Sequence, residues 1–118
     1  MGLDSFWKLP EDSKPPQFKE PLRLCGGMLS GSGEGSFRGK VYAGLIETIT
    51  GESLYKEDIS NDTVKKMADA LDKTSYADAM KSREANEYGY EIGRAEYGHL
   101  QEMFRAYADA GATLHGWW

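Results

Sequence analysis

The sequence predicts an α+β fold, dominated by helix, in which three to four helices pack on a small antiparallel sheet of two to three short strands. Two observations carry this prediction. Beyond residue 35, apolar side chains recur every three to four positions, as they do along one face of a helix. Short apolar segments that suit strands lie near both ends of the sequence, and a proline-rich and a glycine-rich stretch precede the helical part.

Length and composition indicate one domain that spans residues 1–118. Of the 118 residues, 40% are hydrophobic and 28% are charged, as in an ordinary globular domain rather than a disordered segment. We expect a part rich in strands and loops over residues 1–35, a helical core over 36–111 and a C-terminal strand over 112–118. The only cysteine, Cys25, excludes a disulfide within the chain and favours a reducing compartment.

The charge pattern argues against a nucleic-acid partner. The net charge is −5, and the basic residues are scattered among carboxylates, with the pair Lys65–Lys66 as the longest basic cluster. An acidic chain can still attract a basic protein, because complementary charge steers association. No apolar run approaches the ~20 residues that span a bilayer, and the opening residues do not resemble a signal peptide. We therefore expect a cytoplasmic protein without a membrane partner.

The first 35 residues are predicted to hold two short strands and two loops. Residues 3–8, which include a Phe-Trp pair, and residues 22–25, where leucine alternates with other residues, suit strands. Residues 10–21 contain all four prolines, which lack an amide donor and disfavour regular structure, so an extended loop is expected there. The glycine-rich residues 26–35 are predicted to form a second loop.

The first helix is predicted over residues 36–50. Its apolar side chains recur every four residues, at Phe37, Val41, Leu45 and Ile49. Ser36 is its predicted N-cap, because a serine hydroxyl accepts a hydrogen bond from a free amide of the first turn. Gly51 is predicted to end the helix in a left-handed conformation.

A second helix is predicted from a cap at Ser60 or Asp62 as far as Lys73. Its apolar face comprises Val64, Met67, Ala68 and Leu71. Thr74 or Ser75 is predicted to cap a third, shorter helical piece, whose inward side chains are Tyr76, Ala79 and Met80.

The last and longest helix is predicted over residues 84–110, and Gly111 is predicted to stop it. A kink or break is expected near its internal glycines, Gly89, Gly93 and Gly98. Residues 113–118 are predicted to form a final strand that pairs with one of the N-terminal strands. Because a lone hairpin is marginally stable, the helices must cover one face of that sheet.

The aromatic residues predict an interaction surface. Trp117 and Trp118 are costly to leave in water, so we expect at least one of them to close the core. The other is expected to serve self-association or a partner, since tryptophan is enriched at binding hot spots. Tyrosine has the amphipathic character that interfaces use. The predicted interaction surface comprises Tyr90, Tyr97, Trp117 and Trp118.

The start of the first helix is a candidate anion site. Residues 33–41 match neither a P-loop, which needs Gly-Lys followed by serine or threonine, nor a kinase glycine loop with its downstream motifs. Free amides that open a helix nevertheless favour anions. The candidate residues are Gly35, Ser36, Arg38 and Lys40. The alternative interpretation is a flexible loop followed by a well-capped helix.

Candidate metal and catalytic residues are few. Glu96 and His99 lie three positions apart, so a helix places them on one face, as in di-iron bundles. Such sites need a second Glu-x-x-His pair, which the sequence lacks, so neither a metal nor another cofactor is expected. Cys25 as a nucleophile would need a histidine and a carboxylate beside it; its alternative role is a small buried apolar side chain. The sequence shows no complete catalytic constellation, which favours a protein that is not an enzyme.

Several short segments carry a family resemblance over most of the chain. They are the opening Met-Gly-Leu-Asp, Cys25-Gly26-Gly27, residues 36–42, Thr50-Gly51 with Ser53-Leu54-Tyr55, and the closing Gly116-Trp117-Trp118. They resemble small proteins of unknown function from tailed bacteriophages, including marine cyanophages. The resemblance implies no activity and no site. It implies a context, in which a small acidic phage protein in the host cytoplasm binds a host protein or forms a minor structural component.

Three hypotheses of function follow. The first is a phage-encoded cytoplasmic protein that binds a host or phage protein without a cofactor, and it rests on the acidic charge and the abundant tyrosine and tryptophan. The second is a small enzyme or phosphate-binding protein that uses the glycine-rich loop, with Cys25 or His99 nearby. The third is a homo-oligomeric structural protein that buries its C-terminal tryptophans between subunits.

Overall fold

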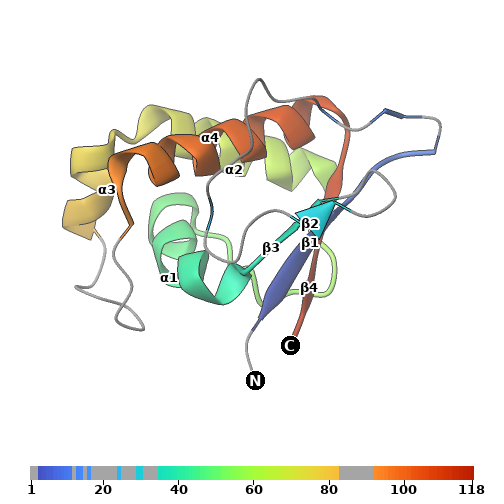
Figure 1. Cartoon of the computed structure of the whole chain (residues 1–118), viewed down its shortest axis with the longest axis horizontal. Coiled ribbons are helices and arrows are strands. Elements are labelled where there is room, and N and C mark those ends of the chain that lie inside the picture. Colours follow the sequence, from blue (N-terminus) through green and yellow to red (C-terminus); the bar gives the residue numbers. More distant parts are fainter. Residues whose placement is uncertain are drawn as a thin grey trace.

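The computed structural model describes residues 3–11, 13–14, 16, 24, 29–30, 35–82 and 92–118. Within them the elements follow the order β1 (Asp4–Lys8), β2 (Leu29–Ser30), β3 (Gly35–Phe37), α1 (Gly39–Thr50), α2 (Asn61–Lys73), α3 (Tyr76–Ser82), α4 (Arg94–Asp109) and β4 (Thr113–Trp117) (Figure 1). Helices packed on an antiparallel sheet confirm the predicted α+β class, dominated by helix. The second predicted strand, at residues 22–25, falls outside the described residues except for Leu24, and so do residues 84–91 of the predicted last helix.

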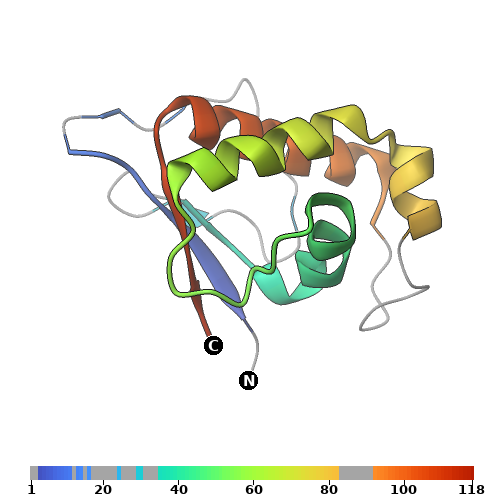
Figure 2. The same cartoon turned by 180° about the vertical axis from the view of Figure 1, so that it is seen from behind.

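The sheet has the strand order β2-β3-β1-β4, so the first and last strands of the chain lie side by side (Figures 1 and 2). β1 pairs antiparallel with β4 along its whole length, from Asp4 opposite Trp117 to Lys8 opposite Thr113. This confirms the predicted pairing of the C-terminal strand with an N-terminal one. The two-residue β2 adds one strand to the two to three expected.

Helix α1 begins at Gly39, later than predicted, and Ser36 is not its N-cap. Ser36 lies in β3, where pairing with both β1 and β2 holds its backbone in the sheet. Arg38 takes the N-cap position and makes no side-chain capping bond. The amide of Lys40 instead donates to the backbone carbonyl of Leu3, 3.0 Å away. Strand pairing has therefore overridden the local capping signal.

The predicted caps and stops of the helices other than the α1 cap are confirmed. Ser60 caps α2, and the Ser75 hydroxyl accepts a hydrogen bond from an amide in the first turn of α3. Gly51 and Gly111 follow the ends of α1 and α4 with positive φ angles of 77° and 82°. α4 begins at Arg94, so Ile92 and Gly93 lie outside it although the last helix is predicted over residues 84–110, and α4 runs through Gly98 without a break. None of the described helices is long and apolar enough to span a membrane.

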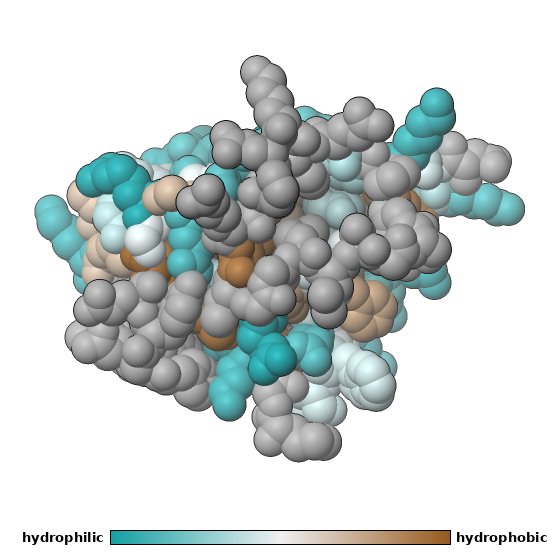
Figure 3. Space-filling view, in the orientation of Figure 1, coloured by the Kyte–Doolittle hydropathy of each residue, from teal (hydrophilic) through white to brown (hydrophobic). Residues whose placement is uncertain are grey.

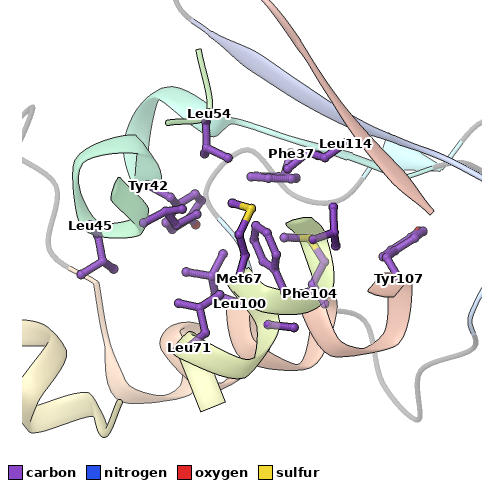
Figure 4. Close-up of a cluster of buried hydrophobic side chains, with 14 of the residues drawn as sticks. Phe37, Tyr42, Leu45, Leu54, Met67, Leu71, Leu100, Phe104, Tyr107 and Leu114 are labelled. Atoms are coloured by element: carbon purple, nitrogen blue, oxygen red, sulfur yellow. The ribbon is translucent and has the colours of Figure 1, made fainter. Parts of the chain in front are cut away.

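The core lies between the helices and the inner face of the sheet. α2 and α4 pack side by side, and the side chains of both converge with those of α1 and the strands (Figure 4). Trp7 of β1 is fully buried, with its ring stacked on Tyr107 at 4.8 Å and edge-on to Phe104 at 5.1 Å between ring centroids. Since burying a large apolar side chain contributes about 1.5–3 kcal/mol, these rings fix α4 against the sheet.

The outer edge of β4 is covered by the connection between α1 and α2. Leu114 exchanges two backbone hydrogen bonds with Ile59, and the amide of Gly116 donates to the carbonyl of Lys56. A Cβ atom at Gly116 would lie only 2.6 Å from the carbonyl oxygen of Leu54. The close approach of the two backbones therefore requires glycine at this position.

Candidate functional site

Large apolar side chains that stay exposed gather around β1 and β4. Within the described part of the chain they are Phe6, Tyr55, Trp117 and Trp118, exposed by 36%, 42%, 75% and 51%. Together with His115, which contacts Phe6, these residues are called the aromatic surface below. In Figure 3, side chains of intermediate hydropathy are exposed at the lower right, beside the lower end of the sheet in Figure 1.

Strand alternation places three members on the face of the sheet turned away from the core. Along β1 exposed and buried residues alternate, so Phe6 points outward whereas Trp7 points into the core. Phe6 is paired in register with His115, and their rings stack at 5.5 Å between centroids with 18° between planes. Trp117 follows two positions after His115 and shares this face, opposite Asp4. The strands therefore hold a row of rings at fixed spacing.

The connection between α1 and α2 supplies the remaining pair. The ring of Tyr55 meets that of Trp118 edge-on, with 5.5 Å between centroids and 70° between planes. The preceding residue, Leu54, is buried in the core, and the following residue, Lys56, accepts the amide hydrogen bond of Gly116. Tyr55 is thus held between two anchored neighbours at the end of β4.

His115 is fixed through both ring nitrogens. Nδ1 lies 2.6 Å from Oδ1 of Asp58 and 3.0 Å from the backbone oxygen of Glu57, while Nε2 lies 2.8 Å from Oγ1 of Thr113. A proton on Nδ1 satisfies these contacts, because Nε2 then accepts from the hydroxyl. Sequence reasoning missed this role of His115. The available signal was the two-residue spacing of Thr113, His115 and Trp117 within a predicted strand.

The contacts of Asp58, His115 and Thr113 join a carboxylate, an imidazole and a hydroxyl, the groups that nucleophilic acyl transfer uses. That chemistry also needs hydrogen-bond donors, often backbone amides, aimed at an oxyanion. The β4 amides on this edge, those of Leu114 and Gly116, already donate to backbone carbonyls of the α1–α2 connection. The cluster therefore supports a positioning role, in which it holds the imidazole within the aromatic surface.

Carboxylates border the aromatic surface. Asp58 lies against the imidazole, yet its side chain remains 77% exposed, and the neighbouring Glu57 is exposed as well. Asp4 lies opposite Trp117 across β1 and β4, and its Oδ1 is 2.9 Å from Nε of Arg38. The border of the rings is thus richer in carboxylates on the side of the α1–α2 connection.

The four candidate anion-site residues lie together at the start of α1, but their neighbourhood is occupied. Gly35 and Ser36 belong to β3, whereas Arg38 and Lys40 lie at the N-terminus of the helix. The guanidinium of Arg38 pairs with Asp4, and the amides of residues 40 and 41 donate to backbone carbonyls. An anion would have to displace these partners. The anion site stays a prediction that the geometry does not favour.

Tyr97 does not belong to the interaction surface predicted for it. Only 1% of the residue is exposed, and its hydroxyl donates to the backbone carbonyl of Thr74 at 2.8 Å. Burial, with a smaller contribution from the charge of Asp72, raises the pKa of Tyr97 to about 12. Tyr97 faces α2, so its place in the apolar stripe of α4 outweighs its interface-type chemistry. Tyr90 lies outside the described residues.

Trp117 and Trp118 are more exposed than expected, whereas Tyr97 is more buried than expected. At least one of them is expected to close the core, yet both are exposed. Leu114 takes the inward position on β4, and Trp7 of the paired strand fills the space beside it. The core is complete without either of the last two rings.

Glu96 and His99 lie one turn apart on α4, as expected from their spacing. The carboxylate of Glu96 accepts a hydrogen bond from the buried hydroxyl of Tyr42. Over the residues that the structure describes, potential metal ligands form no group of three or more. Cys25 lies outside those residues, so its two predicted roles stay predictions.

Comparison with known proteins adds no relative. No protein-family model, no curated protein and no solved structure matches the chain. Function must therefore be inferred from the aromatic surface itself.

Proposed function

We propose that this chain is a small protein-interaction module that binds another protein through the aromatic surface, without a cofactor. The observation that carries the proposal is the exposure of Trp117 and Trp118 beside Tyr55 and Phe6. Burial of apolar surface is favourable by about 25 cal/mol for each Å² removed from water, so rings that stay exposed leave this free energy available to a binding partner. Tryptophan and tyrosine are also the side chains that dominate binding energy at protein interfaces.

The rigidity of the frame supports this proposal. β4 is bonded on one edge to β1 and on the other to residues 56–59, and the imidazole of His115 is fixed at both nitrogens. Binding therefore has to order few backbone groups, which lowers its entropic cost. The resemblance to phage proteins adds a context, in which the partner is a host or phage protein in the cytoplasm.

A capture experiment with matched variants tests the proposal. The tagged chain, a Trp117→Ala/Trp118→Ala variant and a Glu102→Ala control, altered at an exposed position of α4, are used against a bacterial host lysate. A partner retained by the parent and the control should be lost by the double variant, and the purified partner should then reproduce the difference. Equal retention by all three chains would reject the proposal.

The same rings could instead meet in a second copy of the chain, which is the homo-oligomer hypothesis. Sedimentation velocity separates the two hypotheses. A self-associating chain shows a mass above that of the monomer, 13.1 kDa, and the double tryptophan variant then shows the monomer mass. Under the proposed function the parent sediments as a monomer at the concentrations used for capture.

The anion-binding alternative predicts a thermal shift with phosphate or nucleotides, because a ligand of the folded state raises Tm by mass action. With the Arg38 guanidinium paired to Asp4, we expect no shift at millimolar phosphate. A shift that disappears in Arg38→Ala/Lys40→Ala would instead establish the second hypothesis.

A further inference from the structure

We infer that the aromatic surface receives an arginine-bearing, basic segment of its partner, an inference that rests on the proposed function. A cation placed over an indole face within about 6 Å of the ring centre is attracted by the ring quadrupole. Trp117 and Trp118 offer such faces to solvent, and Tyr55 stands beside them. Rings alone would accept an apolar partner equally well, so the surrounding charges decide the kind of partner.

Two exposed carboxylates lie beside His115, next to the row of rings. Asp58 contacts the imidazole of His115, and Glu57 precedes it on the same connection as Tyr55. Both carboxylates are exposed. Glu57 takes part in none of the ion pairs that join described residues. A planar guanidinium can pair with a carboxylate and stack on a ring at the same time.

The nearby cations do not reverse this field. Arg38 is held by Asp4, and the ammonium of Lys56 lies 2.9 Å from Glu52. Lys8 lies opposite Thr113, two positions along β4 from His115 and four from Trp117. Beside His115 the carboxylates of Glu57 and Asp58 therefore outnumber Lys8, while Arg38 and Lys56 are each paired with another carboxylate.

The charges also decide against a second copy of the chain as the occupant. A twofold interface sets the same patch against itself, so both copies would bring the carboxylates of Glu57 and Asp58 into one contact. Each copy further carries a net charge of −5, which opposes association. A basic segment meets complementary charge both in the carboxylates beside the rings and in the net charge of the chain.

Indole resonances provide a direct test. Three nine-residue glycine-serine peptides, with two arginines, two lysines or two citrullines, are titrated into the 15N-labelled chain. The arginine peptide should move the indole N–H signals of Trp117 and Trp118 and leave that of the buried Trp7 in place. The lysine peptide should bind several-fold more weakly, the citrulline peptide should bind at background level, and the arginine affinity should fall as salt rises.

Variants separate charge from ring contact. Glu57→Gln/Asp58→Asn should weaken the arginine peptide by roughly tenfold, Trp117→Ala should abolish its binding, and Glu102→Gln on α4 should change nothing. Equal binding of the citrulline peptide, or motionless Trp117 and Trp118 signals with every peptide, would overturn the inference. A captured partner that needs the tryptophans but ignores salt and the double carboxylate variant would overturn it too, and would leave the proposed function standing.

Discussion

Two glycines set how closely the backbones of this fold approach one another. A Cβ atom at Gly39 would lie 2.2 Å from Oγ of Ser5. This close contact lies between the first turn of α1 and β1. Gly116 plays the same part between β4 and the α1–α2 connection. Ser5 itself is fully buried, and its hydroxyl has no hydrogen-bond partner among the residues that the structure describes, which is an uncommon state for a buried polar group. Small size, rather than polarity, accounts for serine at this contact.

Gly116→Ala should destabilise the chain by about 1–3 kcal/mol, because the new methyl group meets the carbonyl oxygens of Leu54 and Lys56 and both belong to backbone. Gly98→Ala is the matched control. A Cβ atom there meets no described residue within 4 Å, so alanine inside α4 should stabilise the chain by about 0.5–1 kcal/mol. Urea unfolding of the three chains measures both changes, and a neutral Gly116→Ala would contradict the close backbone approach.

Alkaline pH should reveal the burial of Tyr97. Its folded-state pKa of about 12 lies above the ordinary value of 10.0, so the folded chain holds this proton where the unfolded chain loses it. The contribution to stability is fully present below pH 10 and is lost as the pH rises from 10 toward 12. Between pH 9 and pH 11 the parent should therefore lose about 1 kcal/mol more than Tyr97→Phe, measured by urea unfolding. Parallel losses in the two chains would show that the hydroxyl ionises freely in the fold.

At the scale of the elements, local signals and sheet contacts compete. The caps of α2 and α3 and the glycine after α1 depend on neighbouring residues alone, so the sequence predicts them correctly. Ser36 carries an equally good capping signal, but β1, distant in sequence, pairs with it and holds it in a strand beside β2. Tertiary contacts decide whether such a serine caps a helix or lies in a strand. A pattern of neighbouring residues carries no information about those contacts.

Replacement of the α2 cap gives a quantitative check at this scale. Ser60→Ala removes the acceptor for the amide of Thr63, so the free energy of unfolding should fall by about 1 kcal/mol. Ser60→Asp retains an acceptor of the preferred kind and should stay close to the parent. An unchanged midpoint for Ser60→Ala in thermal unfolding would mean that another group satisfies this amide.

Over the whole molecule, the aromatic surface was only partly predictable. The two C-terminal tryptophans are identified by their chemistry, but their exposure depends on Trp7 and Leu114 completing the core first. The stacked imidazole of His115 depends on Asp58, which lies in the connection before α2, far from β4 in sequence. Burial and cross-strand partners emerge only when the first strand, the last strand and the α1–α2 connection come together.

Tryptophan quenching tests this division of the molecule into one buried and two exposed indoles. Acrylamide should quench the emission of Trp117 and Trp118 and spare that of Trp7. Because carboxylates border the exposed rings, caesium should quench them more efficiently than iodide, relative to free tryptophan, at low salt. Trp117→Ala/Trp118→Ala should leave an emission that neither ion quenches. Stronger quenching by iodide would contradict the acidic character of the surface.

The pairing of β1 with β4 also has a consequence for how the chain is made. Lys8 lies opposite Thr113 in this pair although the two residues are 105 positions apart, so the sheet cannot close until residue 113 has been made. Closure of so long a loop carries a large entropic cost, and contacts of such sequence separation slow folding. During synthesis the ribosome releases β1 first and β4 last. The indole of Trp7 therefore cannot be fully buried before β4 has been made. Until then the edge of β1 that pairs with β4 stays unpaired in the nascent chain.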